Sequence, residues 1–279
     1  MSIGFALFDV SPFVYIGYNA SVYLVKSGDK RKIIDTSKAL IENKIYQCYK
    51  FALNSVEKIV PFFIYDGYAK WKNEVQGGTY KEGRSHVDQE IKDELISYVK
   101  SFGGYHVKNN DEEADDVISS VKRSIMEKMK KVDSENFKFF IFTRDNDLLQ
   151  LCDSKTVLYD PVKGQGERGL DYLQAKFGLT NFKKIVLYKI CFGDSSDRIE
   201  GIFKGRRKKP ILARINEFKN YSDFYAWDEV RPFEDKAKSL ESIIRLKKNC
   251  PFETKYVKES DYEKGFYELI SWKDSSNFL

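Results

Sequence analysis

The chain of 279 residues is poor in the residues that build covalent or histidine-based frameworks. Its four cysteines are scattered, with no C-x-x-C pair, which gives little support to a disulfide framework or a thiolate metal site. Two histidines, His86 and His106, are too few for a histidine-rich zinc site. Any metal ion must therefore have oxygen ligands, which favours Mg²⁺ or Mn²⁺.

Long apolar runs are also lacking. No uninterrupted apolar stretch approaches the roughly 20 residues needed to span a bilayer. The run from Ile3 to Val10 follows no basic region and is too short for a signal peptide. We therefore expect a soluble, cytoplasmic protein without a membrane partner. The hydrophobic share of 42% and the aromatic share of 15% argue against global disorder.

Apolar runs alternate with helical patterns in the first part of the chain. Strands are predicted at 3–9, 59–65, 137–142 and 157–159, and helices at about 36–59, 87–102 and 114–131. This alternation predicts an α/β fold with a mostly parallel sheet covered on both faces. After about residue 165 the pattern is helical, with candidates at 170–177, 182–192, 210–218, 234–248 and 262–270.

Acidic residues follow the predicted strands or begin and end helices. They are Asp9, Asp66, Glu113, Asp115, Asp116, Asp145, Asp147, Asp194 and Asp197. Each one alone is explained by a turn or a helix cap. In parallel sheets, however, ligands bind beyond the carboxyl ends of the strands, so these acids are expected to converge and repel one another. Two Mg²⁺ ions about 4 Å apart would resolve that repulsion and support phosphodiester hydrolysis.

Basic residues gather elsewhere, although the net charge is only +5. One cluster consists of Lys204, Arg206, Arg207, Lys208 and Lys209, and a second pair is Lys81 and Arg84. A protein that grips a polyanion and also holds divalent cations needs both kinds of cluster. A solvated face or a localisation signal is the alternative for the first cluster.

The segment between the second strand and the next helix carries a further basic and aromatic group. Lys70 and Lys72 flank Trp71, whose ring is of the kind that stacks on an unpaired base. Ordinary packing explains Trp71 equally well.

Six segments, in their order and spacing, resemble the flap-endonuclease or 5′-nuclease family, especially its phage and bacterial members. They are Phe8–Ser11, Tyr65–Gly67, Tyr80–Arg84, Glu113–Asp116, Thr143–Asp147 and Gly193–Gly201. The resemblance implies a PIN-like nuclease core over 1–162 with a short arch at about 67–110. A helical DNA-binding region over 163–279 would follow, with a helix–three-turn–helix at about 182–218.

The resemblance also implies a division of the acids between two Mg²⁺ sites, in which Mn²⁺ can substitute. Asp9, Asp66, Glu113, Asp115 and Asp116 would line the first site, and Asp145, Asp147, Asp194 and Asp197 would complete the second, some through water. Lys81 and Arg84 would contact the scissile phosphate.

The implied function is that of a 5′-3′ exonuclease or flap endonuclease in DNA replication or repair. Its substrates would be flapped, nicked or branched DNA, and RNA–DNA hybrids by extension. A monomer that cooperates with a polymerase or a single-strand-binding protein is expected.

The chain departs from the family at the hairpin Gly201-Ile-Phe-Lys-Gly205, where one family glycine is replaced or displaced. This puts in doubt the family's backbone-held K⁺ ion, and the adjacent basic cluster is a substitute source of positive charge. Two alternatives remain open. The first is a structure-specific DNA-binding protein of the same fold with an unproductive metal pair. The second is a Toprim-type strand-cleaving enzyme, which Asp145-x-Asp147 also fits.

Overall fold

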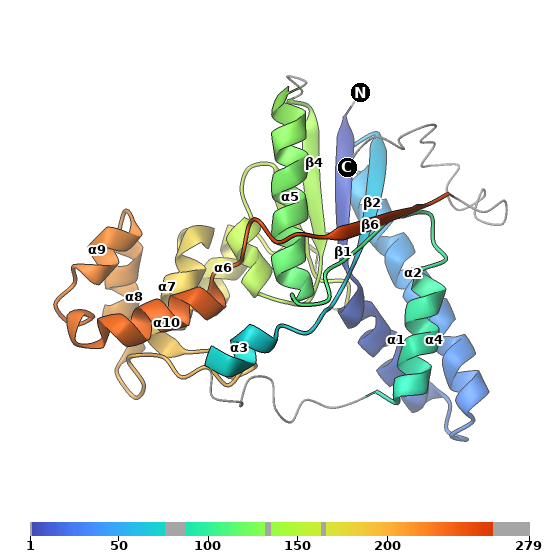
Figure 1. The fold of residues 1–279 in the computed structure, drawn as a ribbon, viewed down its shortest axis with the longest axis horizontal. Helices are drawn as coiled ribbons and strands as arrows, with labels where there is room; N and C mark the ends of the chain where they lie inside the picture. The colour runs from blue at the N-terminus through green and yellow to red at the C-terminus, as the bar shows by residue number, and fades with distance from the viewer. Residues whose placement is uncertain (1, 76–86, 132–134, 163–165, 259–279) are drawn as a thin grey trace.

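A six-stranded sheet forms the centre of the computed structural model, which describes residues 2–75, 87–131, 135–162 and 166–258 (Figure 1). The strands lie in the order β5-β4-β1-β2-β3-β6. Their bounds are β1 Ile3–Asp9, β2 Lys58–Tyr65, β3 Gly104–Lys108, β4 Phe137–Phe142, β5 Thr156–Tyr159 and β6 Glu253–Val257. Strands β1 to β5 are parallel, and β6 pairs antiparallel with β3.

Helices cover both faces of the sheet. Helices α1 (Val10–Leu24), α2 (Lys30–Leu53) and α4 (Gln89–Val99) pack on one face, and α5 (Ala114–Lys131) packs on the other. Successive strand residues point to opposite faces of the sheet. Phe8 therefore packs in the core under α1, α2 and α4, and Leu7 packs in the core under α5. The ring of Phe8 stacks between Phe63 and Phe142, with centroid distances of 5.1 and 4.8 Å. These aromatic contacts fix the register of the three central strands.

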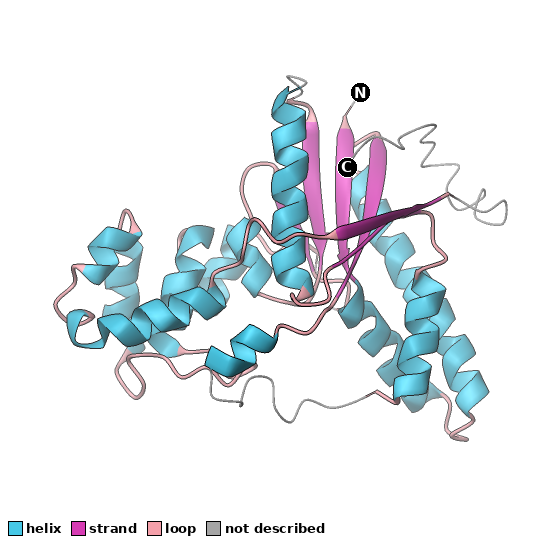
Figure 2. Cartoon of the chain, viewed as in Figure 1, coloured by secondary structure: helices cyan, strands magenta, loops and turns pink. Residues whose placement is uncertain are grey.

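The second half of the chain is mainly helical and extends the core on the α5 side (Figure 2). Its elements are η1 Asp147–Leu151, α6 Leu170–Phe177, η2 Phe182–Lys184, α7 Ile185–Phe192, α8 Lys208–Glu217, α9 Tyr221–Tyr225, η3 Arg231–Phe233 and α10 Glu234–Ile244. A short helix, α3 (Lys70–Val75), lies between β2 and α4 in the sequence. None of the described helices combines the length and apolarity needed to cross a membrane.

The predicted α/β fold with a mostly parallel sheet is confirmed. Two details of the prediction were wrong. Helix α1 was missed and the next helix begins six residues earlier than expected, since α1 is rich in aromatic and β-branched residues. The first strand ends at Asp9, as predicted, and Val10 begins α1. The helix predicted at 262–270 lies outside the described residues.

The predicted arch of 67–110 extends too far. Residues 104–108 form β3 inside the sheet, and α4 packs against α1 and α2. The strand was missed because it is five residues long and its first residue is a glycine. The segment between β2 and α4 thus runs from 66 to 88; it contains α3, and its residues 76–86 lie outside the described part.

Candidate metal centre

The carboxyl ends of the central parallel strands lie side by side, and acidic residues stand at or just after them. Asp9 is the last residue of β1, Asp66 follows β2, and Thr143 follows β4. The registers place Asp9 beside Ile64 of β2 and Phe8 beside Phe142 of β4. The strand alignment alone therefore brings together acids that are far apart in the sequence.

A chain of hydrogen bonds shapes the turn after β4. The Thr143 hydroxyl donates to Asp9 Oδ2 at 2.8 Å and accepts from the backbone N–H of Asp145 at 2.9 Å. The Asp145 carboxylate in turn accepts from the backbone N–H of Asp147 at 2.8 Å, at the start of η1. Burial raises the pKa of Asp9 well above its usual range, and the neighbouring Asp66 raises it further.

Asp66 joins this edge to the beginning of α5. Its Oδ1 accepts from the backbone N–H of Ala114 at 3.0 Å, and its Oδ2 accepts from the Ser11 hydroxyl at 2.5 Å. The next residue, Gly67, lies so close to the loop before α5 that a Cβ there would stand 2.1 Å from Asn109 O. This close approach sets the position of the acids at the start of α5.

Two groups of three carboxylates have oxygens close enough to share an ion. In each group, the candidate ligand atoms all lie within 4.8 Å of one another. The first group is Asp115, Asp145 and Asp147, and the second is Asp147, Asp194 and Asp197. Asp147 belongs to both, so the two candidate positions are adjacent. The two groups therefore overlap at η1, which begins at Asp147.

The chemistry of the first group fits a divalent cation. Burial raises the pKa of Asp115 to about 8, and the nearby carboxylates of Asp116 and Glu113 add to the shift, while Lys72 opposes it. A carboxyl in such surroundings is costly to ionise unless a cation neutralises it. All the candidate ligands are oxygens, which hard cations such as Mg²⁺ prefer.

Lys72 lies among the acids at the start of α5. The sequence had suggested that it adds positive charge beside Trp71, where an unpaired base could stack. Lys72 is only 2% exposed. Its Nζ lies 2.7 Å from Glu113 Oε2, 3.0 Å from Asp116 Oδ2 and 3.8 Å from Asp115 Oδ1. Burial opposes the charge of Lys72, but these three carboxylates outweigh it and raise the pKa. Glu113 and Asp116 therefore face an ammonium group and lie outside both three-carboxylate groups.

A second buried lysine, Lys189 of α7, lies between Asp147 and Asp194 and is 5% exposed. Burial alone would raise the pKa of Asp194, but Lys189 and the hydrogen bonds from Ser196 lower it. Sequence reasoning missed Lys189, and it did not predict that Lys72 would contact the acids. A lysine five residues before Asp194 on an apolar helix was the available signal for Lys189.

The loop after α7 holds Asp194 and Asp197 in a closed turn. Asp194 and Ile199 exchange two backbone hydrogen bonds of 2.8 Å, and Asp197 is buried inside the turn. Closing it puts Arg198 in the left-handed region at φ 58°, which is unfavourable for a residue with a Cβ. The backbone of Gly193 and Gly201 is packed so tightly that a Cβ on either would overlap main-chain atoms.

The basic cluster surrounds the start of α8 and is exposed. Two of its members are paired with acids, since Lys204 Nζ lies 2.9 Å from Glu200 and Arg206 Nη1 lies 2.7 Å from Glu229. Arg207 precedes α8, and Lys208 and Lys209 begin it. Lys81 and Arg84 lie outside the described residues, so the structure does not place them relative to the acids.

Comparison with known proteins decides the family. The profile of the 5′-3′ exonuclease N-terminal resolvase-like domain matches residues 5–178. The chain belongs to this 5′-3′ exonuclease family.

Relatives of this 5′-3′ exonuclease-family chain include free-standing proteins and parts of larger ones. A 5′-3′ exonuclease of Mycoplasmopsis pulmonis is 26% identical over 271 residues, covering 82% of this chain and 85% of the relative. The DNA polymerase I of Lactococcus lactis subsp. lactis is 30% identical over 204 residues, covering 69% of this chain. The chain matches only 22% of that polymerase and 55% of a 5′-3′ exonuclease of Mycoplasma pneumoniae.

Solved structures support the fold. The bacteriophage T5 D15 protein co-crystallised with metal ions has a TM-score of 0.56 at 14% identity, covering 88% of this chain and 90% of the T5 protein. A variant of the T5 D15 flap endonuclease, in a pseudo-enzyme–product complex with DNA and metal ions, has a TM-score of 0.56 at 15% identity. At this identity the likeness concerns the fold alone.

The carboxyl-terminal part of this family member forms a strap (residues 245–257) across α5 and the far edge of the sheet. The backbone N–H of Lys247 donates to Asp116 Oδ1 at 2.7 Å, and that of Cys250 donates to Ser120 Oγ at 3.0 Å. The Lys247 ammonium bonds Glu112 and lies 3.9 Å from the centroid of the Trp71 ring. Trp71 Nε1 also donates to Glu112 at 3.0 Å. Trp71 is therefore a packing residue that ties α3 to the strap.

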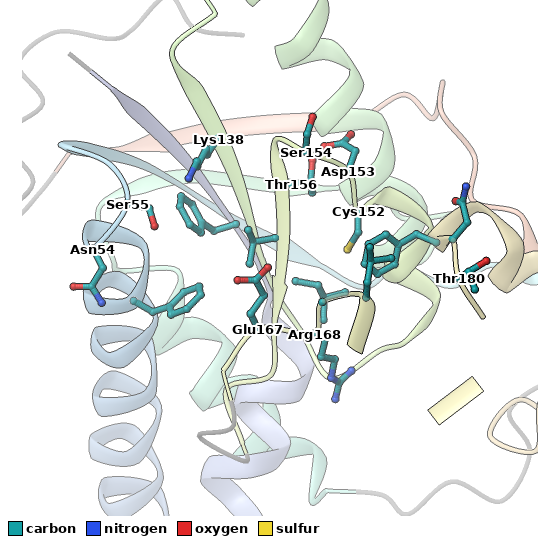
Figure 3. A pocket seen from close by; sticks show the side chains of 18 residues that line it. Asn54, Ser55, Lys138, Cys152, Asp153, Ser154, Thr156, Glu167, Arg168 and Thr180 are labelled. Atoms are coloured by element: carbon teal, nitrogen blue, oxygen red, sulfur yellow. The ribbon is translucent and has the colours of Figure 1, made fainter. Parts of the chain in front are cut away.

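A cavity of about 720 Å³ lies beside β5, at the opposite edge of the sheet from β6 (Figure 3). Residues from α2, β4, β5 and the loop before α6 line it, including Asn54, Lys138, Thr156 and Glu167. None of its lining residues belongs to the two three-carboxylate groups. The acidic centre thus remains the candidate site.

Proposed function

We propose that this chain is a metal-dependent 5′-3′ exonuclease or flap endonuclease that hydrolyses phosphodiesters of branched or nicked DNA during replication or repair. The observation that carries the proposal is the pair of three-carboxylate groups that share Asp147. Family membership supports it, as do the metal ions and DNA named for the T5 structures. RNA–DNA hybrids are a further candidate substrate.

The acids would divide their work at this centre. Asp115, Asp145 and Asp147 would hold one Mg²⁺ or Mn²⁺ ion, and Asp147, Asp194 and Asp197 the other. Bound ions of this kind lower the pKa of water and stabilise the charge on phosphate. Thr143 fixes Asp9, and Asp66 caps α5, so these two acids would orient the ligands directly or through water. Glu113 and Asp116 would hold Lys72 in place beside Asp115 and would not bind an ion directly.

The α7–α8 region would grip duplex DNA as a helix–three-turn–helix within 182–218. The 193–207 loop joins α7 to α8 there. Lys208 and Lys209 occupy the amino-terminal end of α8, where the helix dipole is itself positive. A bound phosphate would relieve this repulsion. We propose that side-chain charge, rather than a backbone-held K⁺ ion, provides the grip in this chain.

The remaining expectations are part of the same proposal. Residues 1–162 would be the PIN-like nuclease core and 163–279 the DNA-binding region, with Lys81 and Arg84 at the scissile phosphate. A polymerase is a fitting partner, because a relative of this chain forms about a fifth of a DNA polymerase I. The bacterial relatives support a cytoplasmic location. A single-strand-binding protein is a second candidate partner. We expect a monomer.

The test uses a 5′-end-labelled flap substrate incubated with Mg²⁺, with Ca²⁺ as the control cation. Mg²⁺-dependent products are expected. Mononucleotides would indicate an exonuclease, and a released flap would indicate an endonuclease. Tight binding of the flap without any Mg²⁺-dependent product would instead support the alternative, a structure-specific DNA-binding protein of the same fold. One observation favours that alternative, namely that two lysines already neutralise part of the acidic centre.

A further inference from the structure

Two ammonium groups lie where the carboxylates of the acidic centre are densest. Lys72 approaches it from α3 and Lys189 from α7, and both are almost completely buried. Lys72 faces Glu113, Asp115 and Asp116, whereas Lys189 faces Asp147 and Asp194. The two lysines thus come from different parts of the chain and pair with different acids. The pairing of buried lysines with these acids therefore does not result from a single local turn.

Buried carboxylates with no cation near them would destabilise the folded protein. Bringing several such groups together costs free energy through both desolvation and mutual repulsion. A divalent ion can remove this cost, but only when it is bound. An ammonium group carried by the chain removes part of it at all times.

We propose that Lys72 and Lys189 are resident counter-cations that let the acidic centre fold without metal and that compete with divalent ions for its carboxylates. This inference rests on the proposed function, since it concerns the same acids. Asp115 lies 3.8 Å from Lys72 Nζ and also belongs to the first three-carboxylate group. Asp147 and Asp194 contact Lys189 and belong to the second. Each lysine therefore shares acids with one candidate ion.

A consequence follows for stability. Millimolar MgCl₂ is expected to raise the melting temperature of the wild-type protein less than that of a variant that lacks one of the two lysines, because the ammonium groups already offset part of the repulsion. In Lys72→Met, which keeps most of the side-chain volume but removes the charge, Glu113 and Asp116 lose their buried partner. The melting temperature in EDTA should fall on the order of 10 °C, as is usual for a broken buried pair in a protein of this size. MgCl₂ should restore most of the loss.

Lys122→Met is the matched control. Lys122 is also a buried lysine, 6% exposed, and its Nζ lies 2.8 Å from Asp153 and 2.6 Å from the carbonyl of Leu151. It contacts none of the nine acids of the centre. Its replacement should lower the melting temperature equally in EDTA and in MgCl₂. Lys189→Met should behave like Lys72→Met.

Thermal unfolding without DNA, with and without MgCl₂, is the measurement. Equal responses of Lys72→Met, Lys122→Met and wild type to MgCl₂ would overturn the proposal. If Lys72→Met does not fold in either buffer, the double variant Lys72→Met/Glu113→Gln decides, because it removes one negative charge together with the positive one. Recovery of folding in EDTA would support a counter-cation, and continued failure to fold would show that Lys72 is needed for packing instead.

Calorimetric titration of wild type with MgCl₂ separates this inference from the proposed function. A wild-type protein that binds Mg²⁺ and cleaves the flap, together with a Lys72→Met variant that gains no metal response, would sink only the lysine proposal. A wild-type protein that neither binds Mg²⁺ nor cleaves, together with a variant that gains the response, would sink only the nuclease proposal.

Discussion

Asp147 lies in both three-carboxylate groups because η1 begins at this residue and turns its side chain toward the α7 loop. Asp145 is two residues earlier and belongs to the first group only. The sequence predicted both as ligands, since they follow a buried strand. It could not predict that Lys189 would lie beside Asp147, because only the packing of α7 against η1 brings these two residues together.

Replacing Asp145 with Asn keeps the shape of the side chain and removes its charge. Cleavage of a flap substrate in Mg²⁺ should fall by orders of magnitude, because a metal ligand acts mainly in the transition state, while duplex binding should change little. Single-turnover cleavage and equilibrium binding are the measurements. Asp111→Asn, at an exposed acid near the start of α5, is the control. Turnover near the wild-type level would remove Asp145 from the metal centre.

Two glycines of the α7–α8 loop are needed for different reasons, one for space and one for its backbone conformation. A Cβ on Gly201 would stand 2.4 Å from Cys191 O, whereas Gly205 has φ 76° with open space around it. Gly205→Ala should cost about 1–2 kcal/mol of unfolding free energy through its left-handed backbone alone. Gly201→Ala should cost more, since main-chain atoms must move. Urea unfolding of both variants compares them, and an equal cost would argue against the close approach.

At the scale of elements, the alternation of strands and helices made the parallel sheet predictable. Helices α6 and α8 were predicted nearly to their observed bounds, since their apolar residues recur at helical spacing. Strands β3 and β6 were not predicted, because each has five residues and β6 is largely exposed. Their pairing depends on contacts across about 150 residues of sequence, which local patterns do not contain.

The strap has a role that follows from its contacts with α3. Lys247 and Glu112 hold Trp71, and Trp71 is the neighbour of the buried Lys72. Lys247→Met should loosen α3 and lower turnover roughly tenfold, equivalent to about 1.4 kcal/mol, with a smaller change in DNA affinity. Lys248→Met is the control at the adjacent position. Lys247→Arg should retain activity if charge is what matters. A loss confined to DNA affinity would show that Lys247 contacts DNA instead.

At the scale of the whole molecule, charge is separated between an acidic edge of the sheet and a basic surface at the start of α8. The sequence predicted both clusters. It did not show that the basic residues are unequal, since Lys204 pairs with Glu200 and Arg206 pairs with Glu229. Glu200 is only four residues before Lys204, but Glu229 is 23 residues after Arg206, and only the fold brings that pair together. Arg207, Lys208 and Lys209 are the exposed members that begin α8 or precede it.

This inequality gives a quantitative expectation for DNA binding. Neutralising Arg207, Lys208 and Lys209 together should weaken binding and flatten the dependence of log K on log salt by up to roughly 0.9 for each lost phosphate contact, or about 2.7 in all. Arg206→Gln alone should leave the slope nearly unchanged, because its partner is Glu229 rather than phosphate. Equilibrium binding to a nicked duplex over a salt series measures both. If the triple variant keeps the wild-type slope, the start of α8 faces away from DNA. If Arg206→Gln changes the slope as much as Arg207→Gln does, the Glu229 pair opens on binding.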